Sequence, residues 1–131
     1  MSAATCAGGP AEAVRRKAPR LVLGVRCGPL AKAVEAHFHG LGWDVCKADT
    51  GADVGGLATR KRAAAVVLAT DALPESGLLT CAKLMAQRPS CRVVLVGPAC
   101  DRLKRYAKLA GAVSYLPDGV SAAAVVRAVG G

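Results

Sequence analysis

The sequence predicts one α/β domain in which a doubly wound parallel sheet of five strands alternates with five helices. Short, unbroken apolar runs recur along the chain, as expected for strands covered on both faces, and Ala63–Ala69 is the clearest of them. Between the runs, apolar residues recur at spacings of three and four, which is typical of one face of a helix. Hydrophobic residues make up 53% of the 131 residues but aromatics only 3%, so the core is expected to be aliphatic. That composition suits parallel layers better than an aromatic-rich β-sandwich.

The expected strands start about one strand and one crossover helix apart, which predicts five consecutive βα units. They are Leu21–Val25, Trp43–Ala48, Ala64–Ala69, Cys91–Gly97 and Ala112–Leu116. The second alternates in character, as a strand at a sheet edge does. The third is apolar throughout and turns polar at Thr70 and Asp71 before Pro74, which predicts the central strand.

The expected helices fill the gaps between these strands. They are Pro29–Leu41, Ala52–Arg62, a third running from Leu78 toward Pro89, Cys100–Ala110, and a last one opened by Ser121. The second is the weakest prediction because Gly55 and Gly56 interrupt it. The positions expected to face the core are Leu30, Ala33, Val34, His37 or Phe38, and Leu41 in the first helix, Leu78, Ala82 and Met85 in the third, and Ala122, Val125, Val126 and Val129 in the last.

Residues 1–19 are expected to be a disordered basic tail, and residues 20–131 the folded domain. The tail is rich in Ala, Gly and Pro with a cluster of cations and lacks apolar periodicity. It also lacks the apolar core of a secretory signal. No apolar run approaches the roughly 18 residues that span a bilayer, so we expect a cytoplasmic protein.

The composition gives no sign of a metal or cofactor. None of the six cysteines is paired at the close spacing of a zinc or redox site, so we interpret them as packing residues. His37 and His39 are two residues apart on a helix and therefore face different directions. The formal charge of +9 raises the question of an acidic partner or nucleic acid, but part of the excess lies in the tail and a solvated surface is the simpler explanation.

Three segments of the chain carry a resemblance to a known family. One is the stretch GAVSYLPDGVS (Gly111–Ser121). In the others, a first strand leads into Pro29, and a central strand is followed by Leu73-Pro74 and a glycine. Together they resemble the receiver domain of two-component response regulators, a flavodoxin-like fold, in which the first segment is similar to the pattern G-A-x-x-Y-L-x-K-P-x-S. The order and spacing of these segments resemble the family from Leu21 to Val129.

The resemblance implies phosphoryl transfer to an aspartate, yet this chain departs from the family at every position that the chemistry needs. The metal-holding acid pair falls on Arg26 and Cys27, and the phosphoacceptor on Thr70. The conserved hydroxyl falls on Gly97, and the lysine on Asp118. A cation at Arg26 would repel Mg²⁺, and Asp118 is an acceptor where a donor is required. The resemblance therefore predicts a degenerate site that does not take phosphate.

Two residues near the predicted degenerate site, Asp71 and Tyr115, allow more than one interpretation. If the register is shifted by one, Asp71 would be the phosphoacceptor, although a lone carboxylate lacks most of the electrostatic stabilisation. Tyr115 falls on the family's switch aromatic, whose coupling partner is replaced by Gly97, so a tyrosine half-buried at a sheet edge is the simpler interpretation. We also expect an ion pair between Arg26 and Asp118.

The function that we expect is a receiver-like signalling domain acting through protein contacts in a two-component or phosphorelay pathway. The face built from the fourth helix, fifth strand and last helix is the family's usual output and dimer surface, which suggests an acidic protein or a homodimer as partner. Its cations are Arg102, Lys104, Arg105, Lys108 and Arg127.

Three other function classes are weaker. A nucleic-acid module would use the basic tail and the fourth helix, but the domain shows no helix-turn-helix and few aromatics for stacking. We therefore expect neither nucleic acid nor a membrane as partner. A small-molecule binder would need a glycine-rich phosphate loop, and Arg26 beside Gly28 gives only a weak anion signal. An enzyme is not expected, because only Asp71 and Asp118 of the nine carboxylates fall at the catalytic edge.

Overall fold

A five-stranded parallel sheet forms the centre of the structure, a computed structural model that describes residues 18–25, 29–48, 51–70 and 76–130. The strands are β1 (Arg20–Gly24), β2 (Asp44–Lys47), β3 (Ala65–Ala69), β4 (Arg92–Gly97) and β5 (Ser114–Pro117). Their order is β2-β1-β3-β4-β5, with every neighbouring pair parallel. The predicted fold class is confirmed, with the apolar run as the central strand and β2 at an edge.

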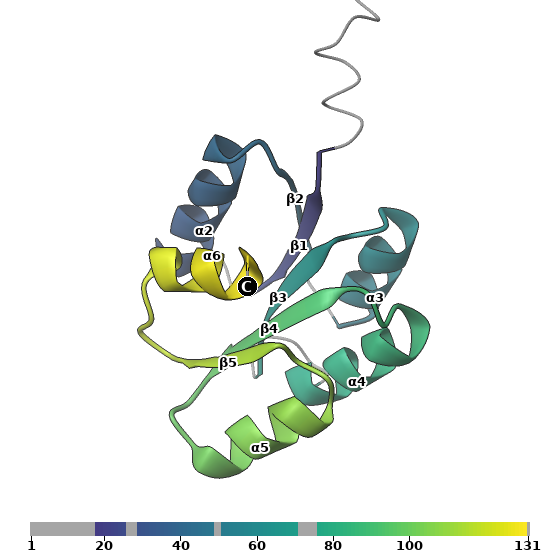
Figure 1. Cartoon of the computed structure of the whole chain (residues 1–131), viewed down its shortest axis with the longest axis vertical. Helices are drawn as coiled ribbons and strands as arrows, with labels where there is room; N and C mark the ends of the chain where they lie inside the picture. The colour runs from purple at the N-terminus through teal and green to yellow at the C-terminus, as the bar shows by residue number, and fades with distance from the viewer. Residues whose placement is uncertain (1–17, 26–28, 49–50, 71–75, 131) are drawn as a thin grey trace, which may run out of the picture.

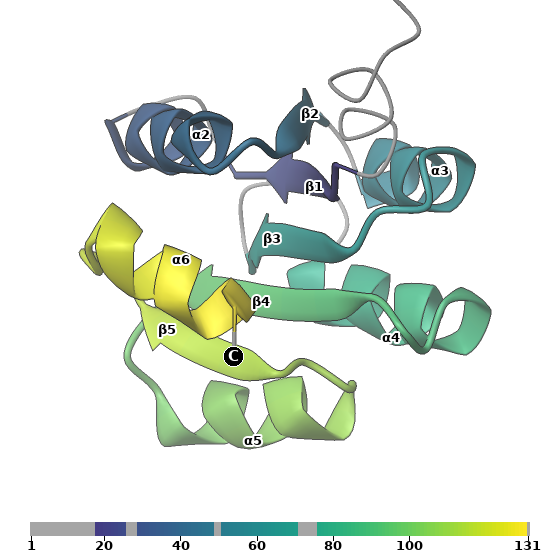
Figure 2. The same ribbon diagram turned by 45° about the horizontal axis from the view of Figure 1, so that its top comes forward.

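Helices cover both faces of the sheet (Figures 1 and 2). They are α2 (Pro29–Gly40), α3 (Gly51–Arg60), α4 (Gly77–Gln87), α5 (Asp101–Leu109) and α6 (Ala122–Gly130). The pair α2 and α6 packs on one face, and α3, α4 and α5 pack on the other. Because successive side chains of a strand point to opposite faces, Val66 and Leu68 of β3 join the core under α3 and α4, whereas Ala65 and Val67 join the core under α2 and α6.

The helix boundaries agree with the sequence to within two residues, but two of the predicted inward positions are wrong. Leu41 lies just beyond the end of α2 and is 60% exposed, because the helix stops at Gly40 and Gly42 follows with a positive φ. In α4, Ala82 is exposed and the buried residues are Gly77, Thr80, Cys81 and Leu84. The buried face of α4 is therefore rotated about the helix axis relative to the predicted face, because Gly77 packs against the end of β3. In α2, Phe38 is the buried choice and His37 is exposed.

Two serines cap their helices. The Ser76 side chain accepts a hydrogen bond from the Leu78 amide at 3.2 Å, and Ser121 accepts one from the Ala124 amide at 3.2 Å, as predicted for the last helix. The glycine pair at 55 and 56 does not break α3. Among the described residues, no helix has the length and apolar character needed to cross a bilayer.

Candidate functional site

The carboxyl ends of β3, β4 and β5 bring three of the predicted positions into one row. Thr70 directly follows β3, and its amide donates to the Val96 carbonyl at 2.9 Å. Gly97 ends β4, and its carbonyl accepts from the Asp118 amide at 2.7 Å. Thr70, Gly97 and Asp118 therefore lie at the carboxyl ends of three adjacent strands, at the edge where parallel α/β folds bind ligands.

Gly97 lies at the most crowded point of this row. A Cβ atom added there would lie 2.4 Å from Thr70 Oγ1, 2.7 Å from the Tyr115 hydroxyl and 3.0 Å from Thr70 Cγ2. Real side chains essentially never approach a Cβ below 3.0 Å. The threonine and tyrosine side chains thus converge on the space that a side chain at Gly97 would need.

The Tyr115 ring is held toward this row by its hydroxyl, which donates to the Pro98 carbonyl at 2.6 Å. The residue is half-buried on the edge strand β5, as the sequence predicted. The bond ties β5 to the start of the β4–α5 connection. The sequence could not show it, because its acceptor is a backbone carbonyl.

Gly77, at the start of α4, packs against the backbone of Thr70. Its amide donates to the Thr70 carbonyl at 3.1 Å. A Cβ at Gly77 would meet the Ala69 carbonyl oxygen at 2.6 Å and Thr70 Cα at 2.9 Å. The first turn of α4 therefore sits directly on the end of β3, which requires a residue without a side chain.

Three predicted site residues, Arg26, Cys27 and Asp71, lie outside the described residues. The expected ion pair between Arg26 and Asp118, and the alternative in which Asp71 is a phosphoacceptor, therefore stay predictions. Within the described ranges, no group of three or more His, Cys, Asp or Glu residues is placed to hold a metal ion.

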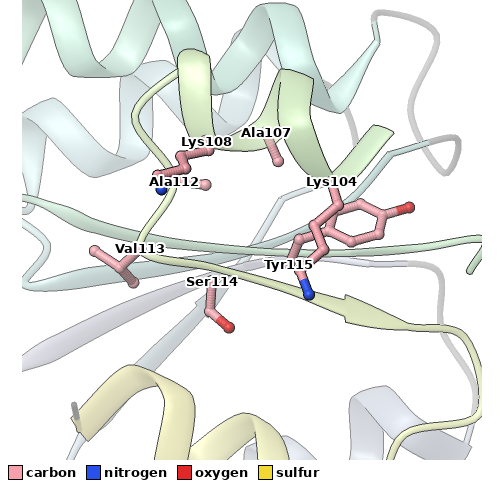
Figure 3. Close-up of a pocket in the computed structure, with 7 residues that line it drawn as sticks. All are labelled: Lys104, Ala107, Lys108, Ala112, Val113, Ser114 and Tyr115. Carbon is pink, nitrogen blue, oxygen red and sulfur yellow. The ribbon is translucent and has the colours of Figure 1, made fainter. Parts of the chain in front are cut away.

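The predicted partner face carries a shallow groove of about 290 Å³ between α5 and β5 (Figure 3). Lys104 and Lys108 line it from α5, above an apolar floor that includes Ala107, Ala112 and Val113. Tyr115 lines the same groove, so one side chain links it to the row at Gly97. The other predicted cations of the face, Arg102 and Arg105 on α5 and Arg127 on α6, are all exposed.

This architecture is that of the receiver domains of response regulators. The solved structures that are similar include a CheY-like response regulator receiver domain protein from Methanospirillum hungatei JF-1, with a TM-score of 0.78 and 14% identity over 86% of this chain and 91% of that chain. The chemotaxis response regulator CheY4 of Vibrio cholerae matches with a TM-score of 0.76 and 12% identity, over 86% of this chain and 97% of that chain.

A response regulator from Burkholderia pseudomallei, solved with a phosphorylated aspartic acid, a calcium ion and citrate, matches with a TM-score of 0.76 and 18% identity. The match covers 85% of this chain and 66% of that one. The sequence itself matches no protein-family model and no curated protein. At such identities the similarity concerns the fold, and the function has to be argued from the site.

Proposed function

We propose that this protein is a receiver-like signalling domain that does not accept phosphate and acts through protein contacts in a two-component or phosphorelay-type pathway. The observation that carries the proposal is the convergence of Thr70 Oγ1 and the Tyr115 hydroxyl on Gly97. In the family that the chain resembles, these positions hold a carboxylate, a switch aromatic and a hydroxyl. Here the nucleophile is replaced by an alcohol, and two protein side chains fill the space beside it.

The sequence differences also remove the positive charges that would stabilise a phosphoryl group during transfer. Phosphoryl transfer depends on cations that neutralise the developing charge on the phosphoryl oxygens. Asp118 stands where the resemblance places a lysine, and Arg26 where it places a metal-binding acid. A carboxylate near the incoming phosphoryl group would repel it. We accordingly propose that the protein is not an enzyme and carries no cofactor.

Titration with Mg²⁺ and beryllofluoride, a phosphoryl mimic, tests the proposal. Backbone amide shifts of Thr70, Gly97 and Tyr115 should stay unchanged up to millimolar metal. Shifts that begin beside Asp71 and spread to Tyr115 would instead show that the acceptor is one residue further along and that the switch still works by phosphate.

The groove between α5 and β5 is the surface that we propose for a protein partner. Its lysines surround an apolar floor, and α5 carries four cations against the single acid Asp101. This combination favours an acidic segment with an apolar anchor. Helix α5 and the edge strand β5 belong to the face that serves as the usual output surface in the family that the chain resembles, and we propose a cytoplasmic partner.

A fluorescent acidic peptide with one leucine anchor is a suitable probe for this groove. Binding should weaken in the double variant Lys104→Gln/Lys108→Gln and stay unchanged in the matched double variant Lys61→Gln/Arg62→Gln, which removes the same charge elsewhere. Equal losses in both variants would mean that net charge alone attracts the peptide.

A homodimer through the same face is the second candidate. It would bring the cations of two α5 helices together, so its formation should require screening by salt. Sedimentation at low and high ionic strength separates the two candidates, since an acidic partner is released by salt while a basic dimer is favoured by it.

A further inference from the structure

Cations from four separate segments gather at the amino edge of the sheet, opposite the edge that carries Thr70 and Gly97. Arg20 and Arg92 begin β1 and β4, which flank the central strand β3. Arg60 ends α3, the next two residues lead toward β3, and Arg88 directly follows α4. We call these residues the amino-edge cluster: Arg20, Arg60, Lys61, Arg62, Arg88 and Arg92.

Side-chain hydrogen bonds hold the segments of the cluster against one another. The Arg20 guanidinium donates to the Lys61 carbonyl at 2.9 Å, and the Arg88 guanidinium donates to the Ala63 carbonyl at 3.4 Å. The connection between α3 and β3 is therefore fastened from both sides by arginines. These two hydrogen bonds hold the exposed residues of the connection in a fixed position relative to the sheet.

Two further contacts join the rest of the cluster. The Thr59 hydroxyl donates to Gln87 Oε1 at 3.4 Å, which joins the last turns of α3 and α4; the two helices run side by side in Figures 1 and 2. Ala64 donates to the Arg20 carbonyl at 2.9 Å and accepts from the Arg92 amide at 3.0 Å. The two strand-initial arginines are thus separated by one strand, a distance of about 10 Å.

The charge of the cluster is largely unbalanced. Of the acids in the described ranges, only Asp44 lies at this edge, and it pairs with Arg20 at 4.0 Å. Among those same residues, none of the other five cations has a carboxylate within salt-bridge distance. At a separation of about 10 Å, two like charges in water repel by about 0.4 kcal/mol, so an anion bound among these cations would lower the electrostatic free energy of the folded protein.

Arg62 adds a second cost. It lies two residues beyond the end of α3 and has φ +51, the left-handed conformation in which glycine is the usual residue. Helix dipoles favour cations at the ends of α3 and α4 and so account for Arg60 and Arg88. They do not account for Arg20 and Arg92, because strand ends carry only small dipoles.

The chemistry of the cluster fits phosphodiesters. Five of its six members are arginines, whose planar guanidinium groups match phosphate oxygens in a bidentate way. The aromatic residue at this edge, Trp43, packs its ring against Phe38 at 4.9 Å between centroids and in an edge-on arrangement. Contacts to a charged backbone are therefore favoured over stacking on the bases of a single strand.

We propose that the amino-edge cluster binds the phosphate backbone of duplex nucleic acid, independently of its sequence. The inference does not rest on the proposed signalling function, which uses the opposite edge and the α5–β5 groove. It revises the expectation of no nucleic-acid partner, because that expectation considered only the tail and α5.

Salt dependence gives the expected size of the effect. Four members of the cluster are exposed, namely Arg60, Lys61, Arg62 and Arg92. Four phosphate contacts give a slope of about −3.6 in a plot of log K against log salt, which is roughly a 150-fold loss of affinity between 50 and 200 mM salt.

The test uses a fluorescently labelled DNA duplex of mixed sequence and the full chain. The triple variant Lys61→Gln/Arg62→Gln/Arg92→Gln should lower the magnitude of the slope to about 1. Arg20 and Arg88 are kept, because their hydrogen bonds hold the connection between α3 and β3. The matched control Arg102→Gln/Lys104→Gln/Arg105→Gln removes the same charge from α5 and should keep the slope and affinity of the unmodified protein.

Three outcomes would overturn the inference. The first is equal loss in both triple variants, which would assign binding to net charge. The second is absence of duplex binding at low salt. The third is binding to phosphatidylserine vesicles through the same residues without binding to the duplex, which would assign the cluster to a membrane surface. Circular dichroism of each variant confirms that the fold is kept.

Discussion

The crowding at Gly97 predicts a specific energetic coupling between the three site residues. In Gly97→Ala, the new methyl group would lie 2.4 Å from Thr70 Oγ1 and 2.7 Å from the Tyr115 hydroxyl, so at least one side chain has to move. Overpacking of this kind costs about 2 kcal/mol, and displacing the Tyr115 hydroxyl from the Pro98 carbonyl adds about 1 kcal/mol. Alanine recovers up to about 1 kcal/mol by restricting the unfolded chain. The expected net loss is about 2 kcal/mol.

The second variant in the cycle is Thr70→Ala, which removes two of the three atoms nearest to the new methyl group. In that background Gly97→Ala should cost about 1 kcal/mol less, because only the flexible end of Tyr115 remains in the way. Urea denaturation of the four proteins measures the coupling, which has to exceed the roughly 0.5 kcal/mol scatter of independent sites.

Gly55→Ala is the matched control. This glycine lies within α3, and apart from the adjoining residues and backbone of the helix itself no heavy atom lies within 4 Å of its added Cβ, so alanine should stabilise the protein by up to about 1 kcal/mol. If Gly97→Ala is as well tolerated as Gly55→Ala, or if its cost is the same with and without Thr70, the described crowding does not exist in solution.

Three further predictions follow from the packing and from the titrating groups. Gly77→Ala should destabilise the protein by about 3 kcal/mol in urea denaturation, because its methyl group would meet backbone atoms of β3 that cannot rotate away. The Glu35 carboxylate accepts a hydrogen bond from Lys47 at 2.9 Å, which lowers the pKa of Glu35 below its ordinary 4.5. The interaction of the Glu35 carboxylate with Lys47 stabilises the folded protein above the ordinary pKa of Glu35, and this stabilisation is lost as the pH falls through the lowered pKa. The melting temperature of Glu35→Gln should therefore be below that of the unmodified protein at neutral pH and equal to it in strong acid. Burial raises the pKa of the Cys81 thiol to about 11, so iodoacetamide at mildly alkaline pH should modify the exposed Cys100 well before Cys81 in peptide mapping; faster modification of Cys81 would show that α4 opens readily.

The strands, with β3 at the centre and β2 at an edge, follow from the sequence, because a continuous apolar run is buried only between two layers of helices. The phase of a helix is less certain, since a spacing of three and four allows neighbouring faces. The sequence predicted that Ala82 of α4 faces the core. Because Gly77 packs closely against the end of β3, Thr80 and Cys81 face the core instead.

The site was predictable to the extent that its members end adjacent strands. Thr70 and Gly97 lie together as expected, whereas the bond from Tyr115 to the Pro98 carbonyl could not be anticipated from residue types. The amino-edge cluster was missed because its members are up to 72 positions apart, from Arg20 to Arg92, and only the pairing of β1, β3 and β4 unites them. A cation just before or at the start of several strands is the signal that could have revealed it.

The hydrogen bond between Tyr115 and Pro98 has a consequence for how a partner would bind the groove between α5 and β5. Because the tyrosine is bonded to the β4–α5 connection and Gly97 has no side chain to compete for it, we expect the groove beside α5 to keep one shape. A binding site that is always competent carries no penalty for populating a rare state. Occupancy then follows the concentrations of the two proteins, so such a domain would transmit information through its abundance and location instead of through a chemical mark.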